Sequence, residues 1–402
     1  MADSIFSIIG FLILGIITGI LSIAFPGFHT NTISSIISSI GITPALAAFC
    51  IMGVLAARPV FEILLSVFFG IPDESTAVSP LPGQALFLEG RGFEAVMICA
   101  FSAASATLVS AALSPLAIAI YPLLYAAAKP YLAVAICVVV LAYALFQFKS
   151  WHALAASLAV FAVSGYCGYV FLEGGTLPDP LFAIFAGLFS PSWLLFSAAG
   201  AKHKSKAHVV QQITYPDFSL AKYVLAGVII AFISLLFPSV SSPVFLAGLV
   251  SPLFAGIAPE AFLAMIYSIS FSLVVFSFSL AASIGRSRVG AIEIASSLVN
   301  YDPAMIIAMF CAYLAALAIS VWIFMAVSRR LSGAISRLEN EAGLKYMVAG
   351  LLVFFIFLEN GVSGVAVFGI TFIVGCLPFL MGTPRVWLMG SLILPTLYYL
   401  MS

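Results

Sequence analysis

Charged residues are scarce in this chain, and that scarcity decides its broad class. Asp, Glu, Lys and Arg make up only 7% of the 402 residues, with a net charge of zero, while 63% of the residues are hydrophobic. An average soluble protein carries about 25% charged residues. With a mean hydropathy of +1.23, the chain is predicted to be an all-α polytopic membrane protein of the cell membrane. We expect membrane lipids, and no nucleic acid, among its partners.

Motifs for metal, nucleotide and covalent chemistry are also missing. The six cysteines lie far apart in apolar runs, without a C-x-x-C pair or a Cys/His cluster, which argues against disulfides and a metal site. No P-loop, dinucleotide-binding fingerprint, Gly-x-Ser-x-Gly or His-Glu-x-x-His occurs, so ATP-driven transport by the chain itself is disfavoured. We therefore expect no enzyme activity, no metal and no cofactor. The first apolar run lacks a basic n-region and is interpreted as a mature membrane helix.

Long apolar runs are what the chain does contain. A run of about 20 residues is long enough to span a bilayer, and the runs predict about 10–12 transmembrane helices, with 93–115 and 130–148 as separate spans. The most basic connections, 201–208 and 329–345, are predicted to be cytoplasmic, and the acidic stretch 172–180 is predicted to face outside.

Two of the apolar runs are broken in the same way. Pro26 interrupts one run and Pro238 the other, and each break follows a glycine at the same distance, Gly15 and Gly227, so that both pairs are 212 residues apart. A proline followed by small polar residues frees backbone groups, which lipid tolerates only where they line a cavity enclosed by protein. Interrupted helices at corresponding places in two halves indicate the binding site of a secondary transporter.

The breaks divide the chain into two halves. Residues 1–200 form the first half and residues 220–402 the second, joined by a cytoplasmic linker at 201–219. Each half is expected to hold a re-entrant half-helix after its break, near 26–44 and near 238–258. Basic loops flank helices of the second half, whereas the matching places of the first half carry almost no basic residue. This reversed bias predicts two inverted-topology repeats.

Small polar side chains follow both breaks and are candidate substrate ligands. Hydroxyl and amide groups at the start of a helix cap its free N–H groups, which also attract anions. The same oxygen atoms would suit Na⁺. A histidine beside them is either a proton carrier or a hydrogen-bonded structural group. The candidates are His29, Thr30, Asn31 and Thr32 after the first break, and Ser239, Ser241 and Ser242 after the second.

A pair of opposite charges lies inside one apolar run. Arg58 and Glu62 are four residues apart, which places them on one face of a helix where they can pair. Charge inside a membrane is costly and faces the protein interior or water. The pair is either a structural anchor for its helix, or an anion-binding Arg58 that Glu62 holds in place and to which Glu62 couples an ion.

The loop at 70–92 is the third candidate region. It is rich in Gly, Pro and hydroxyl side chains, and it is either a solvated loop outside the membrane or part of the site. Its counterpart in the second half, 283–290, is also small and polar, which favours a site. The candidate substrate-binding residues of this loop are Asp73, Ser75 and Thr76, and Asp73 is also a candidate for ion coupling.

Four motifs resemble those of the large permease subunit of tripartite tricarboxylate transporters. They are Gly15-x-x-x-Gly19 leading to Pro26-Gly27, the stretch from Gly70-Ile71-Pro72 to Gly90-Arg91-Gly92-Phe93-Glu94-Ala95, the segment Phe182–Phe189, and Met389-Gly390 followed by Pro395. The variants here resemble a prokaryotic, archaeal branch. The chain departs from the family at Asp73, where a glycine is common, at Ser239 after the second break, and in its shorter length.

The resemblance implies a cation-coupled secondary carrier for an organic anion, working with a small membrane subunit and an extracellular binding protein. We expect a carboxylate- or phosphate-bearing substrate at the two broken helices near the bilayer midplane, with Na⁺ or H⁺ as the coupling ion, and we consider a homodimer. One alternative is a flippase for an anionic polyprenyl-phosphate lipid, whose headgroup the same breaks would bind. A second is an intramembrane enzyme that uses His29 with Asp73 or Glu62 as acid and base.

Overall fold

The structure, a computed structural model, consists of helices. It describes residues 4–23, 30–69, 80–146, 150–175, 177, 180–191, 218–237, 257–338 and 342–401, and every regular element in these ranges is helical. Seven of the described segments are long and apolar enough to cross a membrane, and two shorter apolar helices lie at 180–189 and 218–234. The prediction of an all-α polytopic membrane protein is thereby confirmed. The total of 10–12 spans stays a prediction.

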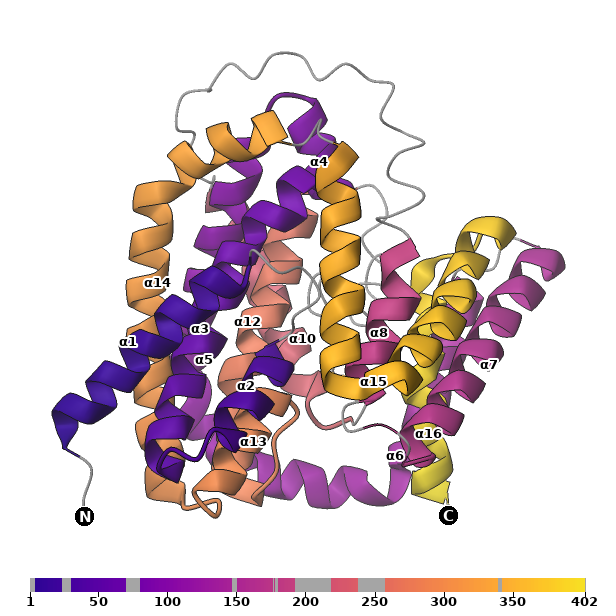
Figure 1. Ribbon diagram of the computed structural model, residues 1–402. Coiled ribbons are helices and arrows are strands. Elements are labelled where there is room, and N and C mark those ends of the chain that lie inside the picture. The colour runs from indigo at the N-terminus through magenta and orange to yellow at the C-terminus, as the bar shows by residue number, and fades with distance from the viewer. Residues whose placement is uncertain are drawn as a thin grey trace.

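The helices form two groups that lie beside one another (Figure 1). The first group takes helices from both ends of the chain, and the second does the same. The first group contains α1 (Ile5–Ser22), α2 (Thr30–Ser39), α3 (Pro44–Leu64), α4 (Pro80–Leu88), α5 (Gly92–Ala128), α10 (Ala221–Ser234), α12 (Pro259–Ile284), α13 (Gly290–Leu298) and α14 (Pro303–Leu338). The second contains α6 (Leu132–Phe146), α7 (Trp151–Glu173), α8 (Pro180–Pro191), α15 (Ala342–Met381) and α16 (Gly390–Met401).

Glycines allow close helix contacts in the second group. Gly168 of α7 lies against the carbonyl of Ser391 in α16, and Gly187 of α8 lies against the Thr371 hydroxyl in α15. Small residues at such crossings let helix backbones approach in a membrane, where apolar surface alone does not drive helices together. Helix α15 is bent at Gly361, whose φ of 64° favours glycine. This second group therefore joins α7 and α8 to the end of the chain.

Helices α1 and α3 of the first group pack in parallel. A side chain on Gly15 would collide with the carbonyl of Cys50, and one on Gly19, a turn further on, would come within 3.0 Å of Ala57 Cβ. The contacts therefore advance in the same direction along both helices. Helix α2, which lies between them in the chain, also packs on α3. A chain that leaves α1 and begins a parallel α3 must return toward the side from which α1 started.

Helices α10 and α12 repeat this parallel crossing in the second half. A Cβ on Gly227 would lie 2.8 Å from the Met265 carbonyl, and further along both helices the rings of Phe232 and Phe276 are 5.3 Å apart. Among the described helices, α5 packs along α12 and α14 packs along α3. Each long helix of one half thus packs against a helix of the other half.

The two parallel pairs run in opposite directions. Helix α3 continues into a short π-helical turn, η1 (Leu65–Phe69), and a Cβ on Gly92, at the start of α5, would lie 3.1 Å from the ring of Phe68 in that turn. The residue before it, Arg91, contacts Glu260 in the first turn of α12. Helix α3 therefore ends where α5 and α12 begin, at the end of the molecule that carries α4 (Figure 1).

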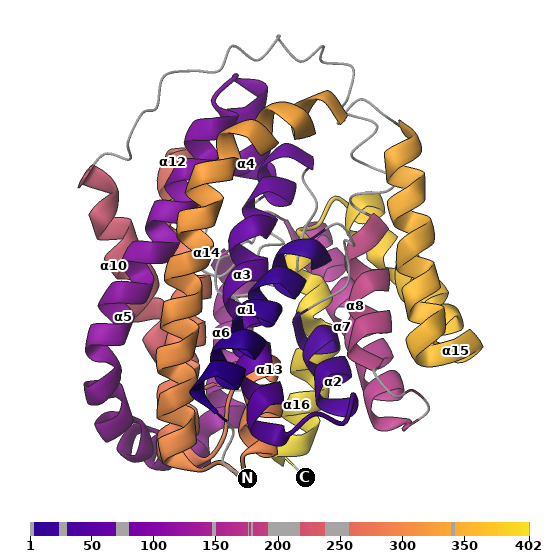
Figure 2. The same ribbon diagram turned by 60° about the vertical axis from the view of Figure 1, so that its left-hand side comes forward.

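Two expected connections are helical instead. Helix α5 continues over 37 residues to Ala128, past Pro115 and Pro122, and α14 continues over 36 residues to Leu338. The prediction that the first span ends at 115, and that a loop begins at 329, is therefore wrong. Both prolines lie on exposed positions of α5, where the chain can bend without disturbing the packed face. Figure 2 shows the end of α14 bending over the top of the molecule.

Candidate functional site

Arg58 lies at the end of the first broken helix. Its Nη1 donates to both the carbonyl oxygen and the hydroxyl of Ser22, each at 3.0 Å, and its side chain is 1% exposed. Ser22 is the last residue of α1, where carbonyl groups lack helical partners and carry partial negative charge. Arg58 thus neutralises the carbonyl end of α1 just before the predicted break. Sequence reasoning missed Ser22, which has no charge to mark it.

Glu62 accepts a hydrogen bond from the same guanidinium. Arg58 Nη2 is 3.4 Å from Glu62 Oε1, which confirms that the two predicted partners face each other. They are the only charged side chains in the buried part of the described chain. Arg58 Nε has no hydrogen-bond partner. Whether the pair anchors α3 or serves transport stays a question of function.

Arg288 plays the corresponding part at the second broken helix. Its Nε donates to the carbonyl of Leu235 at 3.3 Å, and Leu235 directly follows α10. The local structure of the two helix ends also matches, since the hydroxyls of Ser22 and Ser234, 212 residues apart, each donate to the carbonyl three residues earlier. Sequence reasoning singled out the 283–290 segment but did not place Arg288 among the site residues.

A short network holds the loop that carries Arg288. Glu293 of α13 accepts a hydrogen bond from the Ser287 main-chain N–H at 2.7 Å and another from the Tyr301 hydroxyl. The Ser287 hydroxyl in turn accepts from the Val289 N–H at 3.1 Å. Burial lowers the pKa of Arg288, while Tyr125 and Glu293 raise it. Both oxygens of Glu293 are used in this way, so the carboxylate fixes the loop.

The same loop touches the first break. A Cβ on Gly290, at the start of α13, would lie 2.8 Å from Asn31 Oδ1 in the first turn of α2. Helix α2 packs on both α3 and α13. The loop from 285 to 290 therefore lies against Asn31 just after the first break, and Arg288 reaches Leu235 just before the second. Of the neighbouring candidates, Thr32 is buried and Thr30 is partly buried.

The remaining predicted site residues lie outside the part of the chain that the structure describes. Their roles, like those of Thr30, Asn31 and Thr32 in binding, stay predictions. In the described part, no group of three or more His, Cys, Asp and Glu side chains could hold a metal ion. The residues outside it are His29, Asp73, Ser75, Thr76, Ser239, Ser241 and Ser242.

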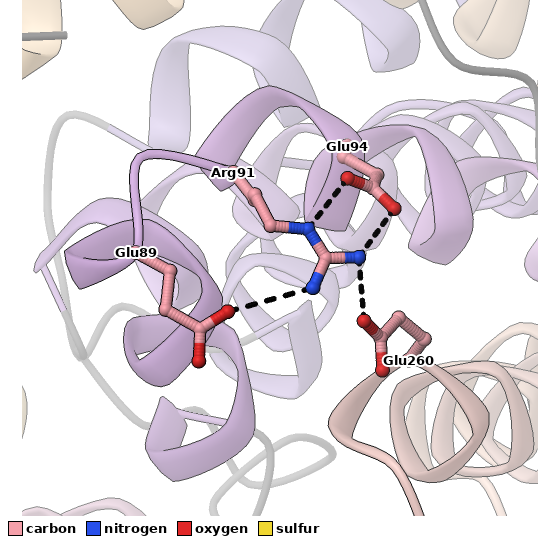
Figure 3. A network of polar contacts seen from close by, with 4 residues as sticks. All are labelled: Glu89, Arg91, Glu94 and Glu260. Atoms are coloured by element: carbon pink, nitrogen blue, oxygen red, sulfur yellow. Dashed lines mark hydrogen bonds and ion pairs between the residues drawn. The ribbon is translucent and has the colours of Figure 1, made fainter.

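Arg91 is the centre of a second polar network (Figure 3). Glu94 accepts from its Nε at 2.9 Å and from its Nη2 at 2.7 Å, while Glu260 lies 2.6 Å from Nη2 and Glu89 3.4 Å from Nη1. The hydrogen bond to Glu94, more than any other contact, raises the pKa of Arg91. The network ties α5 to α12 across the two halves of the chain. Glu260 could not be found from sequence, because nothing local links it to Arg91.

Comparison with known proteins gives one family and one relative. A family model described as "Tripartite tricarboxylate transporter TctA family" matches residues 9–390. The uncharacterised protein MJ1079 of Methanocaldococcus jannaschii is 29% identical over 215 residues, which is 52% of this chain and 52% of that protein. The chain thus matches about half the length of this curated relative. No solved structure matches.

Proposed function

Since this chain belongs to the tripartite tricarboxylate transporter TctA family, we propose that it is a secondary active transporter of an organic anion. The family makes the chain a transporter-type protein, and its helices make it a multi-pass protein of the cell membrane. The proposal adds the substrate class, the coupling to a cation and the place of the site.

The loop from 285 to 290 is the observation that carries this proposal. It lies against Asn31 at one break, and through Arg288 it reaches the carbonyl of Leu235 at the other. The two breaks are therefore neighbours of one short segment, as a single site built from both halves requires. A guanidinium lies at each broken helix end, and guanidinium groups suit carboxylate and phosphate oxygens. Such a site favours an anionic substrate.

We propose further that the two halves are inverted repeats. The parallel α1–α3 pair is repeated by the parallel α10–α12 pair, running in the opposite direction. Parallel packing of α1 and α3 also supports a re-entrant α2. Broken helices of inverted repeats commonly meet at a substrate site near the midplane, and this arrangement supports alternating access by movement of the helices around the breaks.

The coupling ion is proposed to be H⁺ or Na⁺. In other carriers the carbonyl ends of broken helices coordinate Na⁺, but here the carbonyls of Ser22 and Leu235 already accept hydrogen bonds from Arg58 and Arg288. A Na⁺ ion at these two carbonyls would compete with a tethered cation. Glu62, buried beside Arg58, is the described carboxylate best placed to carry a proton.

A small membrane subunit and an extracellular binding protein are proposed partners, because the family is one of tripartite transporters. No observation on the described residues favours the lipid flippase or the intramembrane enzyme over the transporter. Those alternatives are weighed by the same experiment, since each would leave soluble anions untransported.

The proposal is tested by anion exchange in proteoliposomes that contain the purified full-length chain. Radiolabelled citrate, succinate and inorganic phosphate are each offered against the same unlabelled anion inside. We expect exchange of at least one organic anion, its loss in Arg58→Ala and a smaller loss in Arg58→Lys, which keeps the charge but not the planar fork. Exchange of none of the three anions, or unchanged exchange in Arg58→Ala, would contradict the proposal.

A further inference from the structure

The two arginines at the broken helix ends differ in how their charge is compensated. Arg58 is 1% exposed, donates twice to Ser22 and faces the carboxylate of Glu62. Arg288 is half-buried and makes one hydrogen bond to Leu235. Among the described residues no carboxylate pairs with Arg288, because the oxygens of Glu293 are used by Ser287 and Tyr301. Arg288 is thus a partly desolvated cation without an anionic partner.

A charge in that condition is costly unless something compensates it. The carbonyl of Leu235 and the hydroxyl of Tyr125 supply dipoles, but no negative charge. A guanidinium has five N–H donors, and only part of them is used by these two groups. The remaining donors have a geometry that matches a carboxylate or a phosphate, which would supply the missing charge.

The loop keeps Arg288 in this position. Glu293 fixes Ser287 on one side of the arginine, the Ser287 hydroxyl binds the Val289 N–H on the other, and Gly290 lies against Asn31. A side chain held between two hydrogen-bonded neighbours loses less freedom when it binds a ligand. The neighbouring Arg286 is exposed and lacks this support, although it has the same charge.

We propose that Arg288 contacts the substrate directly and binds an acid group of the transported anion at the second break. Glu293 is the positioning residue that aims it. The proposal deepens the proposed function and rests on it. It adds a residue of the second half to a site for which Arg58 is the cation of the first half. Arg286, two residues away in the same loop, takes no part in binding.

Anion binding to the purified full-length chain in detergent tests this assignment. Citrate, succinate and inorganic phosphate are titrated by calorimetry, and the melting temperature is recorded with and without each. Arg288→Gln is compared with Arg286→Gln, which removes the same charge from the same loop. We expect Arg288→Gln to weaken binding by about tenfold or more, Arg286→Gln by about twofold or less, and Arg288→Lys to recover part of the loss.

Glu293→Gln separates position from charge. This variant leaves Arg288 charged but weakens the hold on the Ser287 N–H, and we expect weaker anion binding with Arg288 intact. A purely structural Arg288 would give a different result, in which Arg288→Gln lowers the melting temperature without anion and leaves the affinity unchanged. That result would overturn the assignment while leaving the transporter proposal intact.

Two other results would also overturn it. Equal losses in Arg286→Gln and Arg288→Gln would mean that only the charge of the loop matters. Binding of none of the three anions to the wild-type chain would overturn the assignment together with the proposed function. Should Arg288→Gln fail to fold, the comparison of Arg288→Lys with Arg286→Lys decides, because both keep the charge and only the first loses a positioned fork.

Discussion

Gly53 and Met265 occupy the same place in two helix pairs. The Cα of Gly53 lies 3.1 Å from where a Cβ on Gly15 would be, and the carbonyl oxygen of Met265 lies 2.8 Å from where a Cβ on Gly227 would be. Gly53 and Met265 are 212 residues apart, as are Gly15 and Gly227. The two halves therefore repeat a helix crossing as well as a sequence pattern.

The crossing predicts a strong effect of Gly15→Ala. The added methyl group would collide with the carbonyl of Cys50, and we expect it to destabilise the protein by about 1–3 kcal/mol, the usual cost of overpacking. Gly10→Ala is the control on the same helix, because nothing lies within 4 Å of that position. Thermal unfolding in detergent measures both. Equal effects of the two variants would contradict the packing of α1 on α3.

The buried pair at the first break predicts non-additive effects. Arg58→Ala leaves Glu62 buried without its cation, and we expect a loss of about 3–5 kcal/mol in unfolding free energy. Arg58→Ala/Glu62→Ala removes both charges and should lose less than Arg58→Ala alone. Chemical denaturation of the single and double variants gives the coupling energy. A double variant less stable than either single one would contradict a direct pair.

If the double variant also recovers anion exchange, the pair is a structural anchor. If it recovers stability but not exchange, Arg58 serves the substrate. The two outcomes separate the alternatives that the sequence left open for these residues.

The Arg91 network predicts unequal roles for its carboxylates. Glu260 lies 2.6 Å from Arg91 and is 19% exposed, whereas Glu89 lies 3.4 Å away and is 56% exposed. We expect Glu260→Gln to cost roughly 1 kcal/mol and Glu89→Gln to cost less than about 0.5 kcal/mol. High salt should reduce the difference, since the pair is partly exposed. Melting temperatures at low and at 1 M salt, flagged here as an approximate screening condition, check this expectation.

The hydroxyl of Tyr301 predicts a stability change at high pH. Its hydrogen bond to Glu293 raises the pKa of Tyr301 to about 12, above the value of about 10 for an unfolded chain. The protonated hydroxyl therefore adds stability that is fully present below pH 10 and is lost as the pH rises from about 10 to 12. The difference in unfolding free energy between wild type and Tyr301→Phe should shrink across that range. A constant difference would contradict the bond.

Much of the fold could be predicted because glycine and proline leave marks in a sequence. Gly15 and Gly227 marked two close crossings, and the breaks at Pro26 and Pro238 divided the chain where the helices of each half begin to repeat. Helix length was harder to predict. Pro115 reads as an end, yet α5 continues past it, because a proline on an exposed helix face is tolerated where neighbouring groups compensate for its missing N–H.

The candidate site was predicted where one element holds both partners, and missed where two elements meet. Arg58 and Glu62 are four residues apart on one helix, so a helical period was enough to pair them. Ser22, Leu235 and Glu260 have partners 36, 53 and 169 positions away in the chain. Apolar membrane helices show little difference between buried and lipid-facing sides, so periodicity could not indicate these contacts.

The exchange of helices between the two groups has a consequence for how the protein is made. Helix α8 packs on α15, α7 packs on α16, and α5 packs on α12, so the partner of each early helix is synthesised much later. A nascent chain that has emerged as far as α8 has inserted helices whose packed faces are still open to lipid and to other proteins. Truncated products should therefore be prone to degradation, and membrane insertion factors that shield unpaired helices should matter more for this protein than for one whose halves fold separately.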